Sequence, residues 1–419
     1  MSKLPLAPAP SQPCVLSING GSSSVRFAVH QVHPPYRRLL RGKVDRIGRR
    51  GTELVVSGPS EPTWTYRLAT SGHREAVGAL LNRLEEHPVF ASIAAVGHRV
   101  VHGMAHAQPE RVTGALLAEL RRITPFDPEH LPRELALIEA IGRRHARLPQ
   151  VACFDTAFHC TMPRVATLLA LPRRVAARGV HRYGFHGLSY AYLMEALAAV
   201  DKRAAQGRVI LAHLGSGASL AAVQRGTSRD TTMGFTPTGG LVMSTRSGDL
   251  DPGLVYYLAR EQHITPARFR TMVNEESGLL GVSETSGDMR DLLAREASDV
   301  RAAEAVALFC YQARKCVGAY AAALGGVDTL VFSGGIGENA AVVRARICEG
   351  LGFLGVALDA KRNAAHAPLI STDAGRVKVR VIPTDEELMV AKDVVRTLHL
   401  DSSPERPTTS RGATRRSRI

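Results

Sequence analysis

The sequence has few aromatic residues and little concentration of positive charge. Aromatic side chains make up 5% of the 419 residues, and the net charge is +15. Only the last twenty residues form a basic cluster, and aromatic residues are not interleaved with it. Because nucleic-acid surfaces combine clustered basic and stacking aromatic residues, nucleic acid is not the expected partner. The diffuse positive charge suits anionic small molecules instead.

Paired cysteines and long apolar runs are also missing. The six cysteines contain no C-x-x-C spacing, which favours a reducing compartment. No uncharged apolar stretch reaches membrane-spanning length. The Pro-rich start, Leu4 to Pro13, lacks the charged and then apolar order of a signal peptide. We therefore expect a cytoplasmic protein without a membrane segment.

The commonest phosphate-binding signatures are absent as well. A P-loop requires Gly-Lys followed by Ser or Thr, but the only Gly-Lys pair, Gly42-Lys43, precedes Val44. The H-R-D and D-F-G motifs of protein kinases do not occur. What remains are three Gly-rich turns after expected strands, at 20–21, 215–217 and 334–337. Such turns direct backbone N–H groups at an anion, although Gly and Ser are also frequent in ordinary turns.

The length exceeds what one core usually supports, so two domains are expected. The first half is expected to contain antiparallel strands, including 14–18 and 25–29, and then alternating helices and buried strands, the latter at 93–96 and 151–154. The second half begins similarly, since 208–223 matches 14–29 at five of sixteen positions. Two phosphate-binding hairpins facing a cleft are therefore expected.

Further along the chain, one long helical zone is expected over 288–324, and a strand at 329–332 is followed by the turn at 334–337. A helix is expected to begin at Ala340. The order strand, glycine turn, helix is typical of an anion or nucleotide site.

The chain resembles the acetate kinases, of the superfamily that includes actin and hexokinase. The matching segments run in the family's order over nearly the whole chain. They are INGGSSSVRF (18–27), GHRVVHG (97–103), FDTAFH (154–159), RYGFHGLSY (182–190), HLGSGAS (213–219), MGFTP (233–237), STRSGDLDPG (244–253), SGLLGVS (277–283), GDMRD (287–291), FSGGIGENA (332–340) and PTDEEL (383–388).

The resemblance implies an α/β protein with a duplicated ribonuclease-H-like, actin/hexokinase-like two-domain fold and a central cleft. It also implies transfer of the ATP γ-phosphoryl to acetate, with Mg²⁺, in a homodimer. Domain I would comprise 14–155 plus 384–399, and the nucleotide-binding domain II would comprise 156–383. A disordered leader (1–13) and a disordered basic tail (400–419) would flank them.

The resemblance also implies roles for the residues of this sequence that match the family's motifs. Arg99 and Arg246 would grip the carboxylate and the transferring phosphoryl, His186 would stabilise the transition state, and Asp155 would orient them. Asn19 and Glu386 would face Mg²⁺. The acceptor methyl would meet Val101, Phe126, Phe185 and Pro237. The nucleotide would contact Arg26, His213, Leu214, Gly215, Ser216, Gly217, Asp288, Met289, Arg290, Gly335, Ile336, Gly337, Glu338 and Asn339.

This residue set is consistent with the expected chemistry. An acceptor carboxylate with a pKa near ~4.3 is already ionised at neutral pH, so no general base is required. Positioning and charge neutralisation, which two arginines, a histidine and a metal provide, carry most phosphoryl transfer. His98, His102 and His159 are interpreted as structural.

Three places depart from the family's usual pattern. Ser216 and Asp385 stand where Asn is common, and 124–130 replaces a segment rich in His and Asn, with Asp127 or His130 at the family's histidine. The departures leave open the choice of acceptor and the dependence on Mg²⁺. A propionate or other short-chain carboxylate kinase is the alternative, and a non-catalytic nucleotide-binding module is a more remote one.

Overall fold

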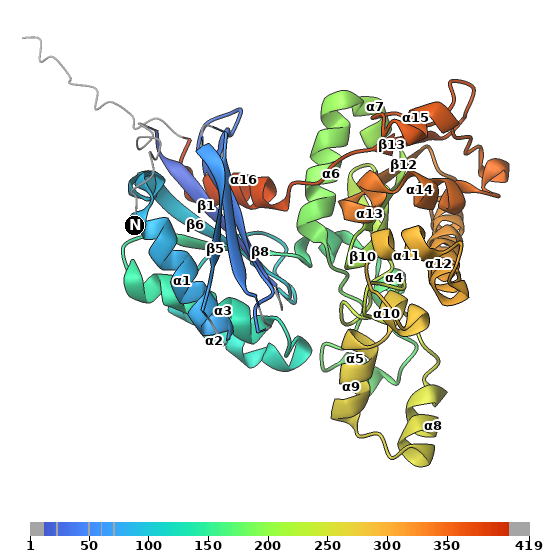
Figure 1. Cartoon of the computed structure of the whole chain (residues 1–419), viewed down its shortest axis with the longest axis horizontal. Helices are drawn as coiled ribbons and strands as arrows, with labels where there is room; N and C mark the ends of the chain where they lie inside the picture. Colours follow the sequence, from blue (N-terminus) through green and yellow to red (C-terminus); the bar gives the residue numbers. More distant parts are fainter. Residues whose placement is uncertain (1–11, 22–23, 49–50, 60, 70–71, 402–419) are drawn as a thin grey trace, which may run out of the picture.

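The computed structural model describes residues 12–21, 24–48, 51–59, 61–69 and 72–401. The tip of the first hairpin at Ser22-Ser23 and most of the expected leader and tail lie outside these residues. Two sheets lie side by side along the long axis of the molecule (Figure 1). Their strand orders are β5-β4-β3-β2-β1-β6-β8-β7 and β11-β10-β9-β12-β13.

The first sheet combines an antiparallel meander with parallel strands. The meander consists of β1 (Cys14–Gly20), β2 (Val25–Gln31), β3 (Arg38–Asp45), β4 (Glu53–Gly58) and β5 (Glu61–Arg67). Strand β6 (Ile93–Val100) pairs parallel with β1, and β8 (Gln150–Phe154) pairs parallel with β6, while the short β7 (Glu110–Arg111) is antiparallel to β8.

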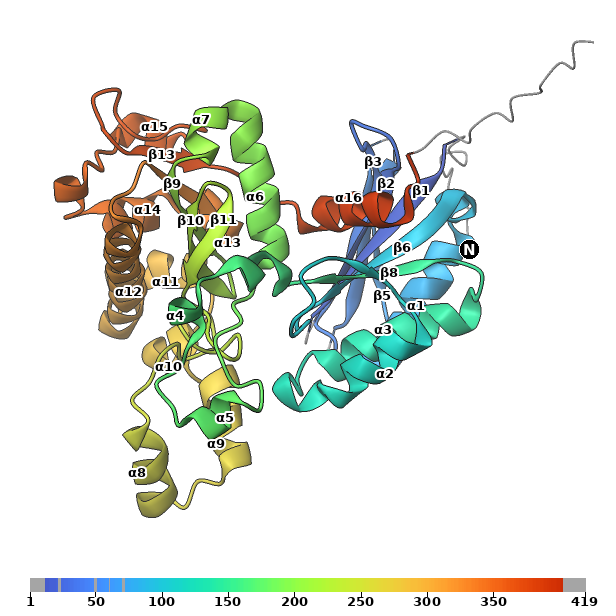
Figure 2. The ribbon, with the colours of Figure 1, turned by 180° about the vertical axis from the view of Figure 1, so that it is seen from behind.

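Helices cover both faces of this sheet because its strands alternate their side chains. On β1, Leu16 and Ile18 pack in one core cluster with α1 (His73–Glu86) and α3 (Leu131–Arg144), and α2 (Gly114–Arg122) packs beside α3. Val15 points the other way, into a cluster with α16 (Glu386–Leu398). Helix α16, the last helix that the structure describes, therefore packs on the first sheet, as Figure 2 shows.

The second sheet repeats the plan. Strands β9 (Arg208–Leu214), β10 (Ala218–Gln224) and β11 (Thr227–Thr231) are antiparallel, and β12 (Thr329–Ser333) and β13 (Lys378–Val381) are parallel to β9. Ile210 and Ala212 pack on α12 (Val300–Leu324), whereas Val209 and Leu211 pack on α6 (Gly187–Val200). The five strands β11-β10-β9-β12-β13 have the same spatial order and the same relative directions as β3-β2-β1-β6-β8 of the first sheet. This repeat is the duplication of the ribonuclease-H-like, actin/hexokinase-like fold.

Shorter elements complete the described chain. The α-helices are α4 (Arg164–Thr167), α5 (Arg173–Ala176), α7 (Lys202–Ala205), α8 (Gly253–Glu261), α9 (Pro266–Glu275), α10 (Gly278–Ser283), α11 (Met289–Arg295), α13 (Gly334–Asn339), α14 (Ala341–Cys348) and α15 (Ala360–Ala364). The 3₁₀ turns are Pro88–Ser92, Thr124–Phe126, Ala157–Thr161 and Gly352–Leu354. In the part of the chain that the structure describes, no helix combines the length and apolarity that crossing a membrane requires.

Three expected elements differ from the structure. Strand β6 extends beyond 96 to Val100, so Arg99 lies within it. The helical zone is interrupted between α11 and α12, where the Asp299 carboxylate accepts from the Arg301 N–H and begins a new helix. The glycine turn is itself helical, because α13 begins at Gly334 rather than after Asn339.

Candidate active site

A cavity of about 450 Å³ lies between the two sheets and receives residues from both. The ends of β1 and β6 contribute to one side, and the turns after β9 and β12 contribute to the other. Its lining comprises Asn19, Gly21, Ser24, Arg26, Arg99, His186, His213, Gly215, Ser216, Gly217, Arg246, Gly334, Gly335, Glu338, Thr384, Glu386 and Glu387. Both predicted hairpins therefore reach one cleft.

Arg99 is fixed at the floor of the cavity by a buried carboxylate. Strands β6 and β8 are parallel, so Arg99 near the end of one lies beside Asp155, which directly follows the other. The Arg99 guanidinium donates to Asp155 Oδ2 from Nη2 at 2.6 Å and from Nε at 3.2 Å. Although burial opposes the charged form, Asp155, Glu386 and Glu134 raise the pKa of Arg99. The arginine is therefore a permanent cation.

Asp155 also holds the start of helix α6. Its Oδ2 accepts from the backbone N–H of His186 at 3.2 Å, and its Oδ1 accepts from that of Leu188 at 3.4 Å. The side chain is completely buried. A carboxylate at a helix N-terminus is stabilised by unpaired N–H groups and by the helix dipole. Both oxygens of Asp155 therefore accept hydrogen bonds from fixed donors of the protein.

His186 precedes α6 in the left-handed conformation, with φ of 59°. Its Nδ1 lies 2.8 Å from Ser219 Oγ, and its ring centroid lies 4.3 Å from that of His213. Burial, followed by the charges of His213, Arg99 and Arg246, lowers the pKa of His186 well below its ordinary value. A neutral ring with Nδ1 accepting from Ser219 carries its proton on Nε2, which can donate to an anion.

Arg246 lies on the opposite side of the cavity and is held by weaker acceptors. Its Nη1 donates to the Pro237 carbonyl at 3.2 Å and contacts Met243 Sδ at 3.5 Å. Within the described chain, no carboxylate lies at ion-pair distance from Arg246. An added Cβ on Gly217 would lie 3.2 Å from His186 Nε2 and 3.5 Å from Arg246 Nη1. The glycine therefore leaves space where both donors converge.

The two glycine turns lie next to each other because β9 and β12 are neighbouring strands. Gly334 has φ of 75°, and a Cβ there would lie 2.6 Å from the Leu214 carbonyl oxygen. Only glycine fits this close approach without strain. Glu338 Oε1 accepts from the N–H of Gly334 at 2.9 Å and from that of Thr384 at 3.2 Å. This carboxylate ties the second turn to the segment that leads into α16.

Asn19 and Glu386 meet at the cavity edge, where Asn19 Nδ2 donates to Glu386 Oε2 at 2.9 Å. Asn19 Oδ1 accepts from Arg99 Nη1 at 3.3 Å. Among the described residues, no group of three or more His, Cys, Asp or Glu side chains could enclose a metal. Magnesium is usually held by one or two carboxylates together with substrate phosphates and water, so this pair of oxygen-bearing side chains fits a magnesium–nucleotide.

Some predicted site residues lie behind the cavity lining rather than on it. Val101 and Phe185 are buried, and Phe126 packs against their cluster around the ring of His102. Leu214 is buried in the second sheet, and Ile336, Gly337 and Asn339 belong to α13. Asp288 begins α11 and pairs with the exposed Arg290, while Met289 is buried. Asp288, Met289 and Arg290 do not line this cavity.

Sequence reasoning missed four residues close to the site. Ser219 orients His186, Thr384 and Glu387 line the cavity, and Glu134 is buried near Arg99. An acidic residue in the apolar stripe of an expected helix was an available signal for Glu134, because Leu131, Leu135 and Ile138 share its buried face.

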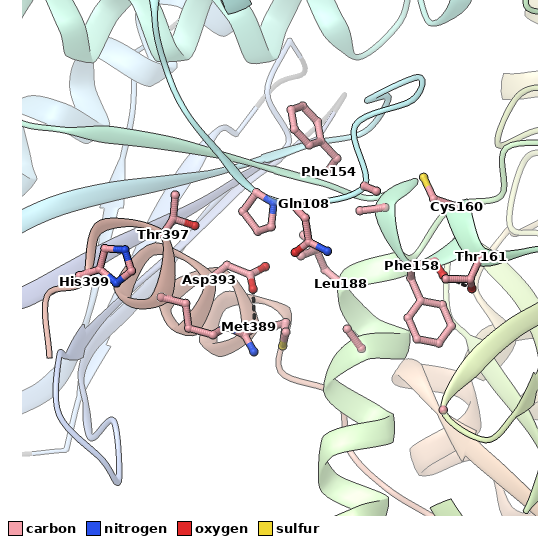
Figure 3. A pocket seen from close by; sticks show the side chains of 17 residues that line it. Gln108, Phe154, Phe158, Cys160, Thr161, Leu188, Met389, Asp393, Thr397 and His399 are labelled. Carbon is pink, nitrogen blue, oxygen red and sulfur yellow. Dashed lines mark hydrogen bonds and ion pairs between the residues drawn. The ribbon is translucent and has the colours of Figure 1, made fainter. Parts of the chain in front are cut away.

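A second cavity, of about 680 Å³, lies near the segments that connect the two sheets (Figure 3). Phe154, Leu188 and Met389 contribute apolar surface, and the Asp393–Arg396 ion pair lies beside them. None of the predicted site residues lines this cavity.

Comparison with known proteins places the whole arrangement in a family. The model of the acetokinase family matches residues 14–392. An acetate kinase from Rhodopseudomonas palustris is 45% identical over 91% of this chain and 98% of its own, and a propionate kinase from Citrobacter rodentium is 42% identical over 91% and 96%.

A solved structure agrees with these sequence matches. A propionate kinase from Francisella tularensis has a TM-score of 0.86 at 34% identity, covering 91% of this chain and 99% of its own. The chain therefore belongs to the acetokinase family and is a phosphotransferase that uses ATP and a carboxyl-group acceptor.

Proposed function

We propose that this enzyme is an acetate kinase, which reversibly transfers the γ-phosphoryl of ATP to acetate in line and forms acetyl phosphate and ADP. The observation that carries the proposal is the convergence of Arg99, Arg246 and His186 on one cavity that two glycine-rich turns also line. Guanidinium groups match carboxylate and phosphoryl oxygens bidentately, and backbone N–H groups suit the remaining phosphates.

The charge and the hydrogen-bond partners of Arg246, Arg99 and His186 indicate a different role for each. Arg246, without a carboxylate partner among the described residues, binds the anionic acceptor and the transferring phosphoryl. Arg99 faces it from the other sheet, held by Asp155, so little reorganisation is needed as charge develops. Neutral His186 donates from Nε2 to an equatorial oxygen of the phosphoryl. The acceptor carboxylate is already ionised, so Asp155 removes no proton.

Asn19 and Glu386 would hold Mg²⁺ beside the nucleotide phosphates, and the ion supplies charge neutralisation there. Arg26, His213 and 214–217 are proposed to contact the phosphates. The adenosine is assigned to Asp288, Met289 and Arg290 and to the segment 335–339, which begins beside the phosphate turns. Domain I is proposed to comprise 14–155 plus 384–399, and domain II 156–383.

The acceptor wall is proposed to be small and apolar. It is assigned to Val101, Phe126, Phe185 and Pro237. The first three belong to one apolar cluster, in which the rings of Phe126 and Phe185 pack against His102, and this supports a short aliphatic acid. Propionate kinases among the similar proteins make propionate the alternative acceptor. One methylene in an apolar pocket changes kcat/KM by roughly 10–200-fold, which is enough to separate the two acids.

Steady-state formation of acyl phosphate from acetate, propionate and butyrate at saturating MgATP tests the proposal. We expect the highest kcat/KM for acetate. A preference for a longer acid by more than about tenfold would replace acetate with that acid. No acyl phosphate from any of the three would support the non-catalytic alternative. The Arg246→Ala variant, purified in parallel, controls for a contaminating kinase.

We also propose a cytoplasmic homodimer. Helix α8 presents Val255, Tyr256 and Tyr257, which are 43, 68 and 57% exposed, next to one another in sequence. Large apolar side chains that are exposed on a surface helix are candidates for a protein interface. Light scattering after size exclusion should give a mass of twice the 45.0 kDa chain, and Tyr256→Glu together with Tyr257→Glu should yield monomers.

A further inference from the structure

Glu134 is a buried carboxyl that lies beneath the acceptor side of the cavity. It belongs to the first turn of α3 and is 2% exposed. Its Oε2 accepts from the backbone N–H of Val101 at 3.0 Å. On its other side lies the end of β1, where a Cβ built on Gly20 would be 3.9 Å from Glu134 Cγ. The side chain thus lies between Gly20, which follows Asn19 in β1, and Val101, which comes two residues after Arg99 and just beyond β6.

The second oxygen of this carboxyl is unsatisfied. Glu134 Oε1 is buried and has no hydrogen-bond partner in the described part of the chain. An unpaired buried oxygen costs stability, and apolar side chains otherwise occupy this face of α3. A leucine would pack there without that cost, as Leu131, Leu135 and Ile138 do. The unpaired oxygen of Glu134 therefore lowers the stability of the fold, and the presence of a carboxyl at this position needs an explanation other than stability.

The charges around Glu134 come from three elements. Arg99 faces it from β6, Asp155 from the end of β8, and Asp127 from the turn before α3. Burial, assisted by Asp127 and Asp155, outweighs the attraction of Arg99 and raises the pKa of Glu134 to about 8. At neutral pH the group is thus protonated, and it can accept from Val101 without competing for the charge of Arg99.

We propose that Glu134 is a positioning residue: its carboxyl holds the Val101 amide, and with it the strand end that carries Arg99, in the geometry that binds the acceptor. The inference rests on the proposed function as a kinase of a short carboxylate. The hydrogen bond fixes the backbone two residues beyond Arg99 and also fixes Val101 in the acceptor wall. Ionisation of Glu134 adds a negative charge that draws the guanidinium of Arg99 away from an anionic acceptor.

Two substitutions separate the hydrogen bond from the charge. Glu134→Gln keeps an oxygen for the Val101 amide but cannot ionise. We expect the acceptor KM of wild type to rise above pH 8. For Glu134→Gln we expect near wild-type kcat/KM at pH 7 and no such rise. Glu134→Leu fills the same space without an acceptor for the amide. We expect its acceptor KM to rise about tenfold at every pH, with the KM for MgATP unchanged.

Glu139→Gln and Glu139→Leu in the same helix are matched controls, because the partly exposed Glu139 pairs with Arg121 and Arg143, which do not line the cavity. Both should follow the wild-type pH profile. An unchanged alkaline rise in Glu134→Gln would overturn the proposal, as would a wild-type acceptor KM in Glu134→Leu. If Glu134→Leu does not fold, the Glu134→Gln profile decides alone. A wild type that phosphorylates no short carboxylate would instead overturn the proposed function, and this inference with it.

Discussion

One oxygen of Asp155 receives two hydrogen bonds from Arg99 and a third from the backbone N–H of His186. The arginine belongs to the first sheet and the histidine to the start of a helix on the second. A single buried carboxylate therefore links the two groups that are proposed to face the transferred phosphoryl, and its charge balances that of the arginine.

Replacing Asp155 with Asn should impair both folding and chemistry. The amide cannot neutralise Arg99, and breaking a buried ion pair typically costs about 3–5 kcal/mol. We expect a loss of stability of this order, measured by urea unfolding, and a fall in kcat/KM of at least about 100-fold. Glu276→Gln is the control, since its pair with Arg268 is exposed and should contribute under about 1 kcal/mol. Equal stability of the two variants would contradict this role for Asp155.

Arg246→Ala should remove turnover while the protein stays folded. Its guanidinium has only a carbonyl and a thioether as partners in the described chain, so little stability depends on it. Loss of a donor that acts in the transition state typically lowers kcat about 10²–10³-fold. Rapid-quench or steady-state rates measure the loss, and the thermal unfolding curve monitors the fold. Near-normal turnover would exclude Arg246 from the mechanism.

Gly217→Ala tests the space between the two converging donors. The added methyl would lie 3.2 Å from His186 Nε2, where a phosphoryl oxygen is proposed to bind. We expect kcat/KM to fall at least about tenfold with little change in melting temperature. Gly318→Ala on α12 is the matched control because a Cβ there meets no atom within 4 Å. That control should gain about 0.5–1 kcal/mol of stability and keep full activity.

Glu386→Gln should weaken the use of magnesium. The neutral amide keeps the size of the side chain and can still contact Asn19, but it loses the charge that attracts a divalent cation. We expect the Mg²⁺ concentration for half-maximal rate to rise about 10–100-fold at fixed ATP. Titration with Mg²⁺ measures it, and binding of Mn²⁺ followed by electron paramagnetic resonance provides a readout independent of activity. An unchanged metal requirement would remove Glu386 from the metal site.

Buried histidines should make the protein sensitive to mild acid. Burial lowers the pKa of His98 and His159 to about 4, from 6.5 in an exposed chain. Between these values the unfolded chain binds protons that the folded protein excludes, so the free energy of unfolding decreases as pH falls from 6.5 to 4. His98→Gln should flatten this decline in chemical unfolding measured at several pH values. A decline as steep as that of wild type would contradict the assignment.

The sequence was most informative where a strand ends in polar residues. Arg99 and Asp155 could be placed together because parallel strands deliver their carboxyl ends to one edge of a sheet. Helix α13 could not be anticipated, because glycines disfavour helices and its carbonyls are bound by a side chain of the next helix: Arg344, fully buried, donates to the carbonyls of Gly337 and Glu338. A buried arginine gives no local pattern that distinguishes it from a surface one.

The positions of the two chain crossings between the sheets have a mechanical consequence. One crossing follows β8 at Asp155, and the other runs from β13 to Glu386 at the start of α16. If the two sheets rotate relative to each other to admit or release a nucleotide, Asp155 and Glu386 lie at the hinge, while Gly21 and Gly217 lie on the parts that move. Because Asp155 lies at one crossing and its Oδ2 accepts from both Arg99 and the backbone N–H of His186, a rotation about this point would displace these groups less than the glycine turns farther away.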